Sequence, residues 1–114
     1  MTQKVLEDFI AQIRGAAASE DSKSTIRALL QESQCRKDLM ADAIAALEED
    51  EVMFFEDETC SIWTCRYDPN VVFAPHEHGM GVHIAVYRGT EVEVLYKRAP
   101  GKLRYGGNTL VKAG

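Results

Sequence analysis

The chain has 114 residues, a net charge of −5 and 46% hydrophobic residues, which fits one compact domain with a modest core. Its basic residues show no Lys/Arg cluster and no aromatic and basic interleaving, which argues against binding to a nucleic-acid backbone. No apolar stretch is long enough to span a bilayer and the N-terminus lacks a signal-peptide core, so we expect a soluble cytoplasmic protein.

Apolar residues at helical spacing occupy the first 50 residues. The pattern predicts one helix after an N-cap at Thr2, a second from Asp21 or Ser22, and a third that ends at the acidic run 48–51. We interpret this run as a solvated exit into the first strand, because a helix C-terminus does not favour negative charge. The apolar stripes are Val5, Phe9, Ile10, Ile13 and Ala17; then Ile26, Leu29 and Leu30; then Leu39, Met40, Ile44 and Leu47.

Short runs rich in β-branched and aromatic residues begin after Asp50. Turn residues separate them at 57–59, 68–70, 89–90 and 99–101. Strands this close together, with no helix between them, predict antiparallel pairing in a sandwich or barrel. Residues 1–50 are thus expected to form a helical segment that packs on a β-domain of residues 51–114, with strands at 52–55, 61–67, 71–76, 82–88, 91–97 and 109–112.

Three cysteines, Cys35, Cys60 and Cys65, form no Cys-x-x-Cys pair. An odd number at this spacing disfavours a disulfide framework and a structural zinc site. We expect small buried thiols in a reducing compartment.

All three histidines of the chain lie between Pro75 and His83. Side chains alternate along a strand, so His76 and His78 are expected to face one point while Glu77 faces away. Neutral imidazole is a good ligand for iron, zinc, copper or nickel, and the pair predicts half of a mononuclear metal site. The alternative is a pair of partly exposed polar residues near a turn.

Residues 70–89 resemble the first sequence motif of the cupin superfamily, in which a glycine, a His-x-His pair, a glutamate and a second glycine follow in order. Asn70 stands at the first glycine position, and asparagine is the residue after glycine that best tolerates a left-handed backbone. His76 and His78 stand at the histidine positions, and Gly89 stands at the closing glycine.

The glutamate position falls on His83 when counted forward from His78, or on Val82 when counted back from Gly89. With His83 the motif supplies three imidazoles, whereas with Val82 the site needs a third ligand. The segment is also similar to small bacterial cupins of the cysteine dioxygenase type, a thiol dioxygenase branch that binds iron with three histidines.

This resemblance implies a mainly β fold with a helical N-terminal segment, the double-stranded β-helix (jelly-roll barrel) of cupins. It implies Fe(II), with zinc or nickel as other choices, bound by His76, His78 and His83, and oxidation of a small thiol to a sulfinate. An arginine would bind a carboxylate of the substrate, and a tyrosine hydroxyl would contact bound oxygen. The candidates are Arg66, Arg88 and Arg98, and Tyr96 and Tyr105, although the tyrosines fit half-buried strand positions as well.

The second cupin motif is missing, and the six strands expected after Asp50 are fewer than a closed barrel uses. We therefore expect an incomplete barrel, whose open sheet edge and less covered interior residues pair with a second copy in a homodimer. Two other functions stay open: a metal- or ligand-binding cupin without turnover, such as a sensor, and an inactive fragment.

Overall fold

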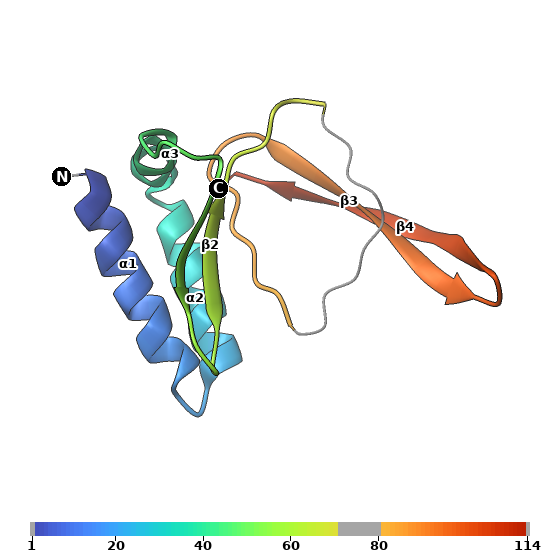
Figure 1. Cartoon of the computed structure of the whole chain (residues 1–114), viewed down its shortest axis with the longest axis horizontal. Helices are drawn as coiled ribbons and strands as arrows, with labels where there is room; N and C mark the ends of the chain where they lie inside the picture. The colour runs from blue at the N-terminus through green and yellow to red at the C-terminus, as the bar shows by residue number, and fades with distance from the viewer. Residues whose placement is uncertain (1, 71–80, 114) are drawn as a thin grey trace.

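Three helices are followed by four strands in this computed structural model, which describes residues 2–70 and 81–113 (Figure 1). The elements are α1 (Thr2–Ala17), α2 (Ser22–Gln34), α3 (Lys37–Ala45), β1 (Glu51–Glu56), β2 (Ser61–Cys65), β3 (Thr90–Ala99) and β4 (Lys102–Lys112). The three predicted helices are confirmed, and so is the change from helices to strands near residue 50.

The helix ends follow from local polar contacts. α1 ends where the backbone N–H and the hydroxyl of Ser19 both donate to the Ala16 carbonyl, at 3.1 and 2.7 Å. α2 begins after Asp21, as predicted, and its first turn is closed by the Ser24 hydroxyl on the Asp21 carbonyl, at 3.1 Å. α3 ends at Ala45, before the predicted end at the acidic run 48–51, and the N–H of Leu47 bonds to the Ile44 carbonyl at 3.1 Å just beyond it. The last carbonyls of the helix bond to an arginine at the end of β2, as described below.

The core lies between the helices. The buried cluster consists of Leu6, Phe9 and Ile13 from α1 with Met40 and Ala43 from α3, and α2 adds its half-buried stripe. The β1–β2 hairpin lies alongside the helices in Figure 1, and Phe54 and Ile62 pack against the same cluster. Helices and first hairpin thus form two layers around one core.

The outer face of the β1–β2 hairpin stays in solvent. The register pairs Met53 with Trp63, and alternation along the strands places both side chains on this face, where they are 47% and 52% exposed. The acidic run 48–51 just before β1 is exposed throughout, as predicted.

The β3–β4 hairpin forms a separate two-stranded sheet that projects away from the helices (Figure 1). Its turn is at the predicted Pro100–Gly101, where Gly101 has φ 72°. The pairing shifts by one residue between Leu95 and Tyr96, which marks a β-bulge.

The expected jelly-roll barrel is wrong for the part of the chain described. Four strands form two separate two-stranded antiparallel sheets, β1–β2 and β3–β4, and no barrel is closed. The fold is a small α/β fold with a helical core. The expectation failed because short strands with turns between them fit isolated hairpins as well as a barrel, and local sequence does not choose between the two.

The predicted strand at 82–88 is absent, and the predicted strand at 71–76 lies outside the described residues. The apolar residues that predicted this strand do not pack in a sheet, and Val82 and Ile84 are each 49% exposed. The three cysteines are free thiols, as expected, but Cys35 and Cys65 are exposed rather than buried.

Candidate functional site

The segment 81–89 carries His83 and leads into β3. Three contacts fix its second half to the helices. The Tyr87 and Ser33 hydroxyls are 2.7 Å apart, the Gln34 side-chain amide donates to the Val86 carbonyl at 3.1 Å, and the Arg88 guanidinium meets the Asp42 carboxylate at 3.1 Å. Burial raises the pKa of the Tyr87 phenol, although the Ser33 hydrogen bond and Arg36 act in the opposite direction.

Of the three predicted metal ligands, His83 is exposed, and His76 and His78 lie outside the described residues. Within residues 2–70 and 81–113, no group of three or more His, Cys, Asp or Glu side chains gathers around one point. His83 is therefore the one predicted ligand whose surroundings are described, and its ring is accessible to an ion in solution.

The residues on either side of the histidine segment, Asn70 and Gly89, both have a left-handed backbone. Asn70 has φ 66°, and it is the one residue other than glycine with positive φ in the described part of the chain. Gly89 has φ 84°. Asparagine and glycine are the residues that tolerate this conformation best.

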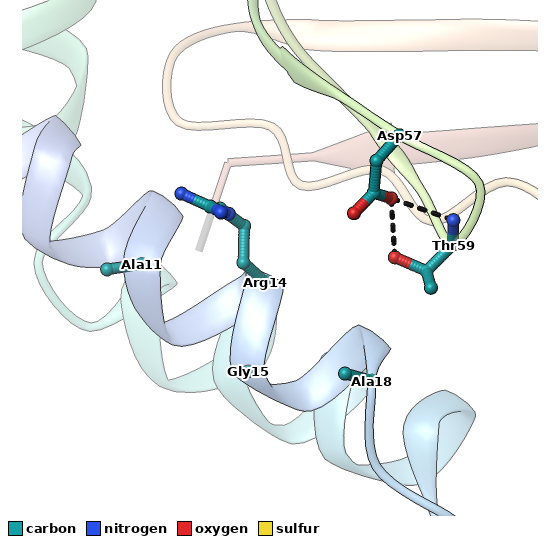
Figure 2. A pocket seen from close by; sticks show the side chains of 6 residues that line it. All are labelled: Ala11, Arg14, Gly15, Ala18, Asp57 and Thr59. Carbon is teal, nitrogen blue, oxygen red and sulfur yellow. Dashed lines mark hydrogen bonds between the residues drawn. The ribbon is translucent and has the colours of Figure 1, made fainter.

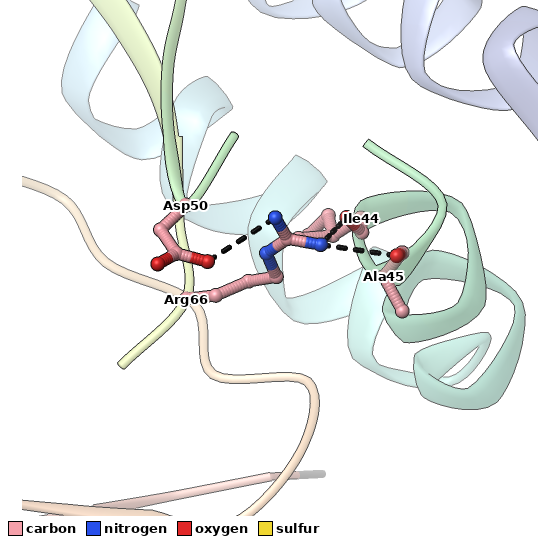
Figure 3. A network of polar contacts seen from close by, with 4 residues as sticks. All are labelled: Ile44, Ala45, Asp50 and Arg66. Carbon is pink, nitrogen blue, oxygen red and sulfur yellow. Dashed lines mark hydrogen bonds and ion pairs between the residues drawn. The ribbon is translucent and has the colours of Figure 1, made fainter. Parts of the chain in front are cut away.

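Arg66 joins β2's end to the end of α3 (Figure 3). Its guanidinium donates to the carbonyls of Ala45 and Ile44, at 3.0 and 3.4 Å, and pairs with the Asp50 carboxylate at 3.2 Å. The carbonyls at a helix C-terminus lack partners within the helix, and a cation there also suits the helix dipole. This position gives Arg66 a clear structural role, and substrate binding by it stays a prediction.

The other predicted substrate residues fall in two places. Arg88 contacts α3 through Asp42, so it lies against the same helix as Arg66. Tyr96 and Arg98 belong to the outer half of β3, where the register pairs them with Tyr105 and Leu103. The two arginines that contact α3 are therefore separated along the chain and in the fold from the hairpin positions.

Sequence reasoning missed Ser33 and Gln34, which hold the segment before β3. Ser33 is completely buried, and it stands seven residues after Ile26 in the apolar stripe of α2. A polar residue at that spacing is the signal that was available, because a buried hydroxyl needs a partner. Gln34 also reaches the Lys112 carbonyl at 3.4 Å, so this one side chain bonds the segment before β3 and the last residue of β4.

An open hollow of about 380 Å³ lies between the C-terminal part of α1 and the β1–β2 turn (Figure 2). Asp57 there accepts hydrogen bonds from the Thr59 hydroxyl at 2.6 Å and its backbone N–H at 2.7 Å, and the pKa of the Asp57 carboxyl is lowered mainly by the hydroxyl. Arg14 stacks on the Phe55 ring, 3.9 Å from its centroid. Both charged groups thus already serve the turn and the packing, and the hollow offers no group poised for catalysis.

No protein-family model, no curated protein and no solved structure matches this chain. Among the helices described, none has the length and apolar character needed to cross a membrane.

Proposed function

We propose that the chain binds a divalent transition metal through imidazoles of the segment between Asn70 and Gly89, with His76 and His78 as ligands and His83 as the third. The observation that supports this proposal most is the left-handed backbone at Asn70 and Gly89, φ 66° and 84°, because these two positions bracket the histidines in the motif.

The donor set fits such an ion. Neutral imidazole binds iron, zinc and nickel, and an exposed His83 has a ring nitrogen accessible to metal. The contacts of Tyr87, Gln34 and Arg88 described above hold the end of this segment on the helices, which reduces the freedom that metal binding would have to restrict.

With Fe(II) bound, the proposed reaction is the oxidation of a small thiol by dioxygen to a sulfinate, in which both oxygen atoms enter the product. The basis for this reaction is the motif's resemblance to thiol dioxygenases. Arg88 is the better candidate for the substrate's carboxylate, since its side chain is 64% exposed whereas that of Arg66 is 28% exposed and bonded to α3. Metal binding without turnover is the second candidate function.

Titration calorimetry with Ni(II) or, without oxygen, Fe(II) tests the metal site. We expect one ion per chain, and we expect His76→Ala with His78→Ala to weaken binding by more than ~100-fold, because losing a group that only orients a metal ligand already costs about 10–100-fold in affinity. Cys35→Ser is the matched control, since it removes an exposed soft ligand elsewhere, on the C-cap of α2. Unchanged affinity in the double histidine variant would refute the proposal.

Oxygen uptake by the iron-loaded protein with a small thiol carboxylate separates the two candidate functions. Uptake that disappears in the double histidine variant supports the dioxygenase. Tight metal binding with no uptake for any thiol supports binding without turnover.

A further inference from the structure

The outer face of the β1–β2 hairpin is built from three cross-strand pairs. The register gives these pairs as Glu51 with Cys65, Met53 with Trp63, and Glu56 with Ser61. Phe54 and Phe55 both point inward, since Phe54 packs against the core cluster and the Arg14 guanidinium lies 3.9 Å from the centroid of the Phe55 ring. Two inward residues in a row mark a β-bulge, and because of it Glu56 returns to the outer face.

An apolar pair therefore lies between two carboxylates on one surface. Met53 and Trp63 are 47% and 52% exposed, and Glu51 and Glu56 are exposed at either end of the pair. The Trp63 indole N–H donates to the Ser61 hydroxyl at 2.6 Å, so its one hydrogen-bond donor already has an acceptor. A partner that covers the indole ring therefore leaves no buried donor of Trp63 unsatisfied.

The charge around this face is strongly negative. Residues 48–68 include eight acidic residues and one basic residue, so this segment has a charge of −7, whereas the whole chain has −5. The basic residue is Arg66, which already bonds to Asp50 and to the end of α3. The field at this face therefore attracts a cationic partner and repels an anionic one, such as a nucleic acid or an acidic membrane.

We propose that this face binds an extended cationic segment of another protein, in which two lysine or arginine residues flank an apolar residue in the order basic-x-apolar-x-basic. Alternate side chains of an extended chain point to the same side, so the three residues contact the face together. Four residues of the segment span about 13 Å and the five from Glu51 to Glu56 about 16 Å, and long side chains bridge the difference. The apolar residue covers Met53 and Trp63.

A second copy of the chain fits this face poorly. Two such faces in contact would bring the Glu51 and Glu56 carboxylates of both copies together, where like charges repel. The three cross-strand pairs also form a surface of only roughly 16 by 10 Å. This area is well below the ~800 Å² that each partner buries in a stable complex of two folded proteins. A short segment suits the size of the face.

Peptide binding tests the proposal. The probe is a fluorescently labelled peptide with the central sequence Arg-Thr-Leu-Thr-Arg, and anisotropy at about 50 mM salt measures its affinity, because this salt screens exposed charges less than physiological salt does. We expect one peptide per chain. A peptide with Arg-Leu-Thr-Thr-Arg has the same composition but turns leucine to the opposite side, and it should bind at least ~5-fold more weakly.

Charge exchange on the protein is the sharper test. Glu51→Lys with Glu56→Lys should weaken binding of the basic peptide at least ~10-fold and should create binding of a Glu-Thr-Leu-Thr-Glu peptide, since both contacts again join opposite charges. The control, Glu7→Lys with Glu32→Lys, makes the same change in net charge at exposed positions of α1 and α2. It should leave the affinity for the basic peptide within ~2-fold. Circular dichroism checks that both variants stay folded.

The single tryptophan supplies a second readout. Emission from Trp63 should shift to shorter wavelength as the basic peptide binds, and Trp63→Ala should weaken binding of the labelled peptide at least ~10-fold. Absence of binding at ~1 mM peptide, a concentration that detects even a weak complex, overturns the proposal. So does equal affinity of the basic peptide for the wild-type chain and the folded Glu51→Lys, Glu56→Lys variant. An emission shift caused by raising the protein concentration alone would assign the face to a second copy instead.

Discussion

Ser33 and Tyr87 are joined by a hydrogen bond of 2.7 Å between their hydroxyls, across 54 positions of the chain. The Ser33 hydroxyl also bonds to the Leu30 carbonyl within α2, at 2.6 Å, so it serves one partner in its own helix and one in the segment before β3. Ser33 is 0% exposed and the Tyr87 ring packs against the core cluster. This pair is one of the contacts that attach the segment before β3 to the helical core.

Ser33→Ala is expected to destabilise the protein by about 1–3 kcal/mol, because it leaves the Tyr87 hydroxyl half-buried without this partner. Tyr87→Phe should cost less, about 1 kcal/mol, since Ser33 keeps its bond to Leu30. Urea denaturation measures both values. Ser24→Ala is the control, because its hydroxyl bonds to a carbonyl at an exposed site. Equal effects of Ser33→Ala and Ser24→Ala would show that the contact to Tyr87 is not stabilising.

Gln34→Ala should loosen the base of the β3–β4 hairpin and leave the helices intact. The amide of Gln34 bonds to the carbonyls of Val86 and Lys112, and the Ala113 N–H bonds to the Gly89 carbonyl at 3.2 Å in the same region. We expect faster hydrogen exchange at Ala113, by about 10-fold, with unchanged exchange in α1. Gln31→Ala, an exposed position of the same helix, is the control and should change neither rate.

The helices could be predicted because the pattern that forms them is local. Leu6, Phe9 and Ile13 bury one face of α1, and turn residues such as Pro100 and Gly101 stand where the chain reverses. The barrel was wrong because each strand described pairs only with its neighbour in the chain, and whether neighbouring hairpins join into one sheet depends on contacts that local sequence does not specify. The helices were expected to cover a β core, whereas residues such as Met40 form the core themselves.

The site was predictable to a lesser extent. The left-handed backbone at Asn70 could be expected from residue type, and the structure has it with φ 66°. The contacts of Arg66 and Arg88 with α3 were not predictable, because an arginine in a β region gives no sign of which helix it will meet. The convergence of His76 and His78 stays a prediction, since both lie outside the described residues.

Two glycine substitutions should change stability in opposite directions. Gly89→Ala is expected to cost about 1–2 kcal/mol, because φ is 84° there and a Cβ disfavours that conformation although the space around it is open. Gly15→Ala should stabilise by about 0.5–1 kcal/mol, since Gly15 lies inside α1 and its added methyl group meets no atom within 4 Å. Thermal denaturation measures both, and Gly89→Asn should recover part of the loss. Equal effects of the two alanine variants would contradict the backbone explanation.

Arg66→Ala should destabilise the protein by about 2 kcal/mol, because α3 loses two hydrogen bonds from a charged donor at its end. Arg88→Ala is the contrast. Its ion pair with Asp42 is exposed on both sides, and such pairs contribute less than about 1 kcal/mol. Chemical denaturation of both variants tests the difference, and Arg66→Lys should restore the charge but only part of the bonding. A larger loss from Arg88→Ala than from Arg66→Ala would reverse the assignment.

Tyr67 should resist ionisation in alkaline solution. Its hydrogen bond with Cys65, then burial and the charges of Cys65, Glu91 and Glu51, raise the pKa of the phenol to about 12. A pKa raised above the unfolded value of about 10 stabilises the folded state below pH 10, and this contribution is lost as the pH rises toward 12.

Absorbance near 295 nm follows tyrosine ionisation. Tyr67→Phe should not alter the increase in absorbance between about pH 9 and 11, because Tyr67 does not titrate in that range. Cys65→Ala should bring one more tyrosine into that range, and Cys60→Ala, the control, should not. A Cys65→Ala titration identical to that of the wild-type chain would exclude the thiol as the main cause.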